Sequence, residues 1–148
     1  MYSSAVPTPN PSAAATAKKL RILIVEDHAP TRMAMSRLIR QAGADVVTAR
    51  DGEEGLGYLL TQRFDVLLTD LRMPVMDGFE FAREVRTHSP CRQVRLVALT
   101  AIRDPIAYTR TWSAGYDAHL EKPLTVEKLE DLAARLLSGG SVSGRPTT

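Results

Sequence analysis

The chain has 148 residues, of which 44% are hydrophobic and 24% are charged, and its formal net charge is +2. This balance is typical of one soluble folded domain, and no apolar run approaches the roughly 18 residues that a membrane span needs. Lysine and arginine are spread along the chain rather than gathered in one stripe, so we expect no nucleic-acid partner for this chain. The single cysteine, Cys91, excludes an intramolecular disulfide and a cysteine-based metal cluster.

The two ends differ in composition from the middle of the chain. Residues 1–18 carry mostly Ser, Thr, Pro and Ala, without the charged and apolar regions of a secretory signal, and residues 138–148 are rich in Gly and Ser. We therefore predict a flexible N-terminal tail over 1–18, one domain over 19–137 and a flexible C-terminal tail over 138–148. The lone thiol indicates a reducing compartment, so we expect a cytoplasmic protein without a membrane contact.

Short apolar and β-branched runs predict five strands, because they have strand length and are bounded by turn residues. In chain order these are 20–25, 45–49, 64–70, 94–100 and 118–120. The third run is the most distinctive, because it ends abruptly in Asp70, and Pro74 prevents its continuation as a regular strand.

Apolar residues at helical spacing predict a helix after each strand. Each predicted helix is marked by a cap, a stop residue or an apolar stripe. In chain order, the markers are Pro30 and Gly43 for the first helix, Leu56, Leu59 and Leu60 for the second, Asp77 and Gly78 for the third, Asp104, Pro105 and Gly115 for the fourth, and Thr125 for the fifth. Because parallel strands need crossover connections, the fivefold alternation predicts an α/β fold, with a doubly wound parallel sheet covered by helices on both faces.

Polar residues of different kinds follow four of these strands. Glu26 and Asp27 follow the first, Asp70 ends the third, Thr100 ends the fourth, and Lys122 follows the fifth. The carboxyl ends of parallel strands share one edge, where ligands bind in open α/β sheets. Three carboxylates there repel one another unless a cation lies among them, and oxygen ligands suit Mg²⁺ better than zinc. Together with a lysine and a hydroxyl, they are the groups needed to receive a phosphoryl group.

The ordered set of motifs resembles the receiver domain of two-component response regulators, in the CheY-like superfamily. The motifs are Glu26-Asp27, Asp70 with Met73-Pro74 and Asp77-Gly78, Thr100-Ala101, and Lys122-Pro123. The resemblance runs from about Lys19 to Leu137. It implies a flavodoxin-like (βα)5 fold, a five-stranded parallel sheet with the strand order 2-1-3-4-5, which agrees with the alternation above.

The resemblance also implies roles for the acidic residues. Asp70 would be the phosphoacceptor. Asp27 and Asp70 would bind Mg²⁺ directly, and Glu26 would act through water. The backbone carbonyl of Arg72 would be a further protein ligand.

The remaining site residues would act on the phosphoryl group. Thr100, with Ala101, would bind it and change position on phosphorylation, and Lys122 would pair with it. The peptide bond before Pro123 is usually cis in the family. His119 stands where the family usually has Tyr or Phe, and a switching role and a plain strand histidine are equally compatible with the sequence.

Tyr108 and Trp112 are four residues apart on the fourth predicted helix and so share a face. By the resemblance this face adjoins His119 and the fifth helix, the surface that contacts downstream proteins. We predict that Trp112 is substantially exposed and forms a partner contact, against the alternative that both rings pack into the core.

The expected function is that of a phosphoacceptor receiver in a two-component or phosphorelay system, with Mg²⁺ as the cofactor. Its partners would be a sensor histidine kinase or a histidine phosphotransfer protein, and a downstream protein. Phosphorylation would switch the surface of the fourth helix, fifth strand and fifth helix. No dedicated enzyme is expected beyond self-catalysed phosphorylation of Asp70 and slow hydrolysis, and the chain would be a monomer or a weak homodimer.

Four alternatives fit the sequence to different degrees. The chain could be a docking module that acts without phosphorylation, or the receiver fragment of a hybrid histidine kinase. A phosphohydrolase with an aspartyl nucleophile is disfavoured, because such enzymes place a second Asp where this chain has Arg72. A flavin or nucleotide site is less compatible still, because no glycine-rich loop follows the first strand.

Overall fold

The structure is a computed structural model that describes residues 19–73, 76–88, 93–100 and 105–137. The predicted tails over 1–18 and 138–148, Cys91 and Ala101 lie outside the described residues, as do the side chains of residues 105–108. Within the described part, strands and helices alternate as the sequence predicts: β1 (Arg21–Val25), α2 (Ala29–Gln41), β2 (Asp45–Ala49), α3 (Gly52–Thr61), β3 (Val66–Asp70), α4 (Gly78–Thr87), β4 (Arg95–Thr100), α5 (Pro105–Ala114), β5 (Ala118–Glu121) and α6 (Val126–Leu137).

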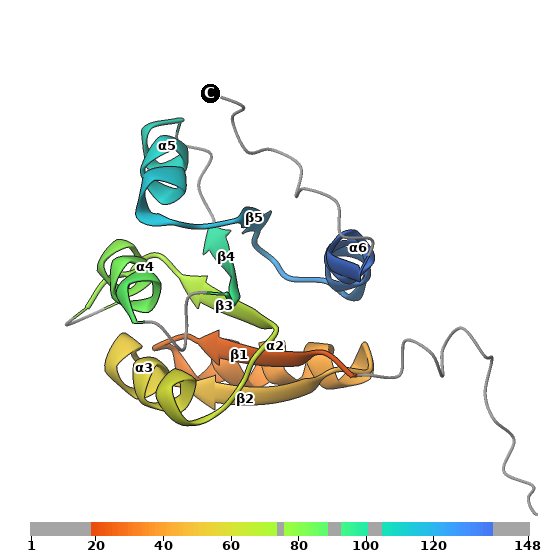
Figure 1. The fold of residues 1–148 in the computed structure, drawn as a ribbon. Helices are drawn as coiled ribbons and strands as arrows, with labels where there is room; N and C mark the ends of the chain where they lie inside the picture. Colours follow the sequence, from red (N-terminus) through yellow and green to blue (C-terminus); the bar gives the residue numbers. More distant parts are fainter. Residues whose placement is uncertain (1–18, 74–75, 89–92, 101–104, 138–148) are drawn as a thin grey trace, which may run out of the picture.

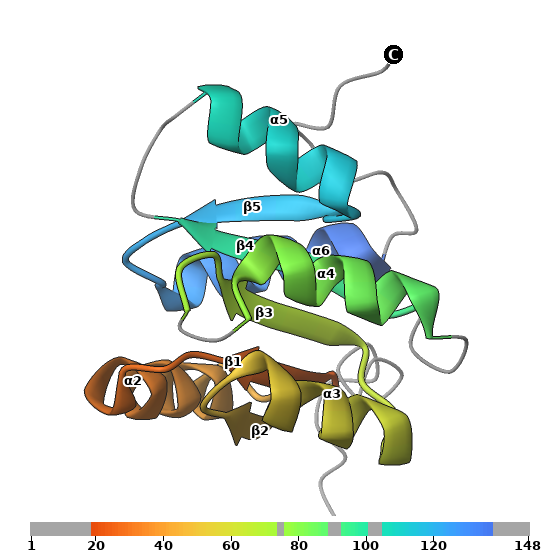
Figure 2. The ribbon, with the colours of Figure 1, turned by 90° about the vertical axis from the view of Figure 1, so that its left-hand side faces the viewer.

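The strands form one parallel sheet in the order β2-β1-β3-β4-β5, as predicted. β3 lies at its centre, with Val25 opposite Thr69 of β3, and Asp70 opposite Leu99 of β4. Among the described strands, β5 pairs with β4 alone and forms one edge of the sheet. Because all strands run in the same direction, their carboxyl ends lie along a single edge (Figure 2).

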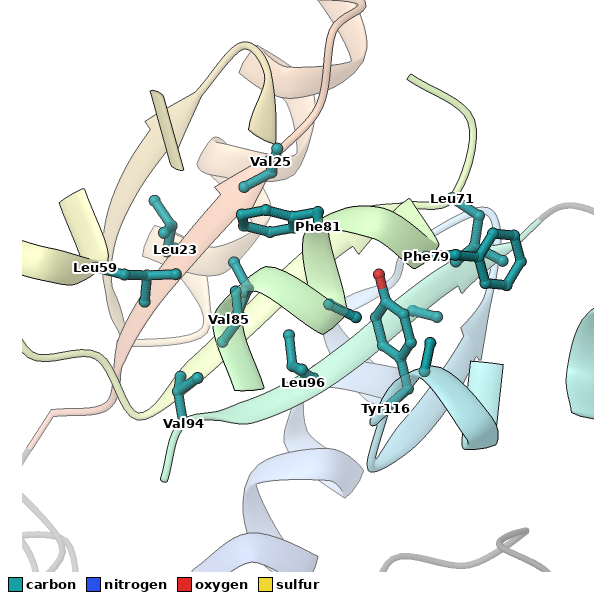
Figure 3. Close-up of a cluster of buried hydrophobic side chains, with 14 of the residues drawn as sticks. Leu23, Val25, Leu59, Leu71, Phe79, Phe81, Val85, Val94, Leu96 and Tyr116 are labelled. Carbon is teal, nitrogen blue, oxygen red and sulfur yellow. The ribbon is translucent and has the colours of Figure 1, made fainter. Parts of the chain in front are cut away.

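Helices cover both faces of the sheet, with α3, α4 and α5 on one face and α2 and α6 on the other (Figures 1 and 2). Alternate strand residues supply the two cores: Leu23 and Leu67 face the first group of helices, whereas Ile24 and Leu68 face the second. Both sets are fully buried, which explains why the strands are continuous apolar runs in the sequence. Figure 3 shows the first core, in which Phe81 and Val85 of α4 pack over β1.

The start of β3 and the cap of α2 have identifiable physical reasons. β3 begins at Val66 rather than Phe64, because the carboxylate of Asp65 turns back to accept the backbone N–H of Arg21 at 2.8 Å. α2 is capped by His28, whose ring accepts from the backbone N–H of Thr31. The cap is thus the ring of His28, although Glu26 and Asp27 stand immediately before it in the sequence. None of the described helices combines the length and the apolar character needed to cross a bilayer.

Candidate functional site

Three carboxylates meet at the carboxyl edge of the sheet. Glu26 and Asp27 follow β1, and Asp70 is the last residue of the neighbouring strand β3. One oxygen of each lies within 4.8 Å of the others. Glu26 is only 2% exposed, whereas Asp70 is half-buried and Asp27 is exposed, so the cluster extends from the protein interior to the solvent.

Lys122 provides the positive charge of this cluster. It follows β5, and its ammonium group lies 3.0 Å from Oδ2 of Asp70 and 3.5 Å from Oε1 of Glu26. Burial by itself would lower the pKa of Lys122. The hydrogen bond to Asp70, with the charges of Asp70 and Glu26, outweighs burial and holds that pKa above its ordinary value. Lys122 is therefore a fixed cation against Asp70.

The backbone also shapes the surroundings of Asp70. The N–H of Arg72 donates to Oδ1 of Asp70 at 3.1 Å, while Oδ2 faces Lys122, so both carboxylate oxygens are oriented. The side chain of Arg72 is exposed. Thr100 ends β4, and its carbonyl accepts the N–H of Lys122 at 2.8 Å. This bond joins the residues that follow β5 to the neighbouring strand β4. The peptide bond between Lys122 and Pro123 is cis.

The acidic cluster fits a divalent cation. Three carboxylates against one ammonium group leave an excess of two negative charges when all are ionised. Burial raises the pKa of Glu26 above its ordinary value, and the charge of Asp70 raises it further, although the N–H of His28 works in the opposite direction. Oε1 of Glu26 is buried, and among the described residues its polar contact is the ion pair with Lys122 at 3.5 Å. An oxygen-binding cation of charge +2 would relieve the repulsion and give this buried oxygen a closer partner.

The comparisons with known proteins decide the family. Residues 22–134 match the model of the response regulator receiver domain. The chain belongs to this family. It is 34% identical over 115 residues to a probable chemotaxis protein CheY of Rhizobium etli, covering 77% of this chain and 89% of that protein.

Other members place the receiver domain in longer proteins. A gliding motility regulatory protein of Myxococcus xanthus is 35% identical over 124 residues, which is 83% of this chain but 16% of that protein. The receiver domain of the sensor histidine kinase PA1611 from Pseudomonas aeruginosa, solved with a magnesium ion in its active-site cleft, has a TM-score of 0.74 and 30% identity, covering 81% of this chain and 98% of that one.

The receiver's predicted contact surface needs a correction. Trp112 is 9% exposed, so the prediction of a substantially exposed indole is wrong. The ring lies edge-on to His119 of β5, with centroids 4.6 Å apart, and the neighbouring Thr111 is fully buried. α5 has few apolar residues, so burial of the Trp112 ring helps to hold the helix on the sheet. The side chain of Tyr108, the other predicted residue of this surface, lies outside what the structure describes.

His119 is tied to α5 by its ring. Nε2 hydrogen-bonds with the hydroxyl of Thr111, and the ring contacts the indole of Trp112. Burial lowers the pKa of His119 to about 4, so the ring is neutral at pH 7. The ring thus takes the place of an uncharged aromatic side chain here.

This shift predicts a pH dependence of stability. The unfolded chain protonates His119 below pH 6.5, whereas the folded protein does so only near pH 4. Protons therefore favour the unfolded state, and the stability due to neutral His119, complete above pH 6.5, is lost as the pH falls toward 4. We expect the melting temperature of the wild type to fall more steeply over this interval than that of His119→Phe. Parallel curves for the two proteins would contradict the prediction.

Two site residues were missed by sequence reasoning. Gly78, predicted as a helix start and a motif residue but without a role at the site, packs so closely that an added Cβ would lie 2.7 Å from the carbonyl oxygen of Asp70. Tyr116 is fully buried, and its hydroxyl donates to the carbonyl of Gly78 at 2.7 Å (Figure 3). The signal for Gly78 was its place eight residues after Asp70; nothing in the local sequence marks Tyr116.

Proposed function

We propose that this receiver domain accepts a phosphoryl group on Asp70, with Mg²⁺ bound by the neighbouring carboxylates. The observation that carries the proposal is the position of Asp70, between the ammonium group of Lys122 at 3.0 Å and the acidic oxygens of Glu26 and Asp27. A structural acid at the end of a strand needs one counter-charge, but it does not need two further carboxylates beside it.

Each residue has a distinct part in the proposed transfer. A carboxylate oxygen of Asp70 attacks phosphorus, the bond from phosphorus to the donor's histidine nitrogen breaks, and that nitrogen keeps the electron pair. Lys122 offsets the negative charge gathered on Asp70 and the incoming phosphoryl oxygens, and the N–H of Arg72 orients the attacking carboxylate. When bound, Mg²⁺ would supply charge neutralisation for the phosphoryl oxygens, with Asp27 and Asp70 as direct ligands, Glu26 through water and the carbonyl of Arg72 completing the set.

The proposed consequence is a switch on the far side of β4. Thr100 and Ala101 would bind the phosphoryl group, and Thr100 would move toward it, which biases β5, α5 and α6 between two arrangements. This change would alter the contact between His119 and Trp112, because the two rings join β5 to α5. A downstream protein would bind at the surface of α5, β5 and α6.

The proposed phosphate donor is a sensor histidine kinase or a histidine phosphotransfer protein. Support comes from the family, whose members here include both a CheY protein and the receiver of a histidine kinase. Residues 19–137 would form the complete receiver, either by itself or within a longer protein.

The test is phosphorylation by acetyl phosphate, followed by measurement of the intact mass. With Mg²⁺, the wild-type protein should gain about 80 Da, the mass of one phosphoryl group. Asp70→Asn, which keeps the shape of the side chain but removes the nucleophile, should gain nothing, and the wild type should gain nothing when EDTA removes the cation. No gain by the wild type would favour the alternative function, a docking module that acts without phosphorylation.

A further inference from the structure

A second lysine lies against the loop that carries Lys122. Lys128, in the first turn of α6, donates from its ammonium group to the carbonyl of Glu121 at 2.5 Å and to the carbonyl of Pro123 at 2.9 Å. These carbonyls belong to the residues immediately before and after Lys122. One side chain thus holds the loop on both sides of the residue that faces Asp70.

The loop lies beyond the end of the sheet ladder. β5 ends at Glu121, so the regular ladder with β4 stops there, although the N–H of Lys122 still donates to the carbonyl of Thr100 at 2.8 Å. Pro123 has no N–H to donate to a neighbouring strand. The two bonds from Lys128 therefore anchor the backbone on both sides of Lys122, where the ladder no longer does.

The helix gives no reason for a lysine at this position. Thr125 caps α6 by accepting the backbone N–H of Lys128 at 3.2 Å, which makes Lys128 the third helical residue. A capping box has Glu or Gln there, and a positive charge in the first turn opposes the helix dipole. A residue that is unfavourable for its own helix is commonly retained for a contact elsewhere. The observed contacts of Lys128 are with the Glu121–Pro123 backbone.

We propose that Lys128 is a positioning residue, which holds the Glu121–Pro123 backbone so that the ammonium group of Lys122 stays against Asp70. The proposal deepens the proposed function and rests on it where phosphoryl transfer is concerned. Lys128 itself does not touch the phosphoacceptor; it acts through Lys122. Its ordering of the loop is independent of phosphorylation and can be measured separately.

The first experiment compares rates of phosphorylation by acetyl phosphate with Mg²⁺. Lys128→Met keeps most of the side chain and removes the ammonium group. It should slow the gain of mass about tenfold, the size of effect seen when a residue that orients a reacting group is replaced. Lys128→Arg, which can still reach two carbonyls, should recover part of the rate. Arg135→Met is the matched control, because it removes a positive charge from the same helix, where Arg135 pairs with Asp131 instead.

A double-variant comparison separates positioning from general damage. If Lys128 acts through Lys122, then adding Lys128→Met to Lys122→Met should cause no further loss of rate. A full tenfold loss in that background would overturn the proposal, and so would a Lys128→Met rate equal to that of Arg135→Met.

The second experiment needs no phosphate. Amide hydrogen exchange at Lys122, whose N–H is bonded to Thr100, should be about tenfold faster in Lys128→Met than in the wild type and unchanged in Arg135→Met. If the wild type fails to accept a phosphoryl group, the proposed function fails, but this measurement still decides whether Lys128 holds the loop. Equal exchange in Lys128→Met and the wild type would overturn the positioning role.

Discussion

Arg86→Met should lower the free energy of unfolding by about 3 kcal/mol, the lower end of the range for breaking a buried ion pair, because the pair with Asp117 is only partly buried. Arg86 lies near the end of α4, and its guanidinium group donates to the carbonyl of Val94 at 2.8 Å, to the carbonyl of Gly115 at 3.0 and 2.9 Å, and to the carboxylate of Asp117 at 2.7 Å. Asp117 also accepts the backbone N–H of Leu96 at 2.9 Å. Methionine fills much of the space but leaves two carbonyls and a partly buried carboxylate without these donors.

Urea denaturation followed by the fluorescence of the single tryptophan, Trp112, measures this loss. Arg83→Met is the control, because Arg83 is an exposed arginine on the same helix and its replacement should change stability by less than about 0.5 kcal/mol. Arg86→Lys should fall between the wild type and Arg86→Met, since an ammonium group cannot reproduce the fork of the guanidinium. Similar unfolding midpoints for Arg86→Met and Arg83→Met would show that this network adds little.

Gly78→Ala should damage both stability and the site. The new Cβ would lie 2.7 Å from the carbonyl oxygen of Asp70 and 2.7 Å from Cα of Leu71, and neither backbone atom can turn away as a side chain could. We expect a loss of about 1–3 kcal/mol in the free energy of unfolding, as for other overpacked sites. Because relief of the clash moves Asp70 relative to Lys122, phosphorylation by acetyl phosphate should slow by about tenfold or more.

Gly57→Ala provides the matched comparison. Gly57 lies in α3, where an added Cβ meets no atom within 4 Å, so alanine should raise stability by about 0.5–1 kcal/mol and leave phosphorylation unchanged. Thermal unfolding and intact mass after acetyl phosphate treatment give the two readouts. An unaltered phosphorylation rate in Gly78→Ala would mean that the Asp70 loop tolerates displacement.

The sequence predicted the fold because its signals were local and redundant. Residues 96–99 of β4 are buried on both faces, so they appear as an uninterrupted apolar run, and Gly43 and Gly115, both with positive φ, ended helices as expected. Element ends were less accurate where a side chain competes with the backbone, as Asp65 does for the N–H of Arg21. Such competition depends on a partner 44 residues away, which no local pattern reveals.

For the site, chain order was enough to bring Glu26, Asp27, Asp70 and Lys122 together, since the residues that follow parallel strands must share an edge. What could not be predicted depends on packing across elements. Trp112 was assigned to the surface because the family resemblance places its helix face at the contact surface, yet the ring is buried against the sheet. Tyr116 and Lys128 act on distant or flanking backbone atoms, and backbone carbonyls have no sequence signature.

Because β5 is an edge strand, the two parts of the site differ in their resistance to local unfolding. Asp27 and Asp70 follow β1 and β3, which have neighbours on both sides, whereas Lys122 follows a strand that pairs with β4 alone among the described strands. Border strands detach more readily than interior ones in native-state fluctuations. Such a fluctuation would remove the ammonium group from Asp70 while the acids stay together, so the proposed cation-binding half of the site would persist longer than the proposed phosphate-binding half.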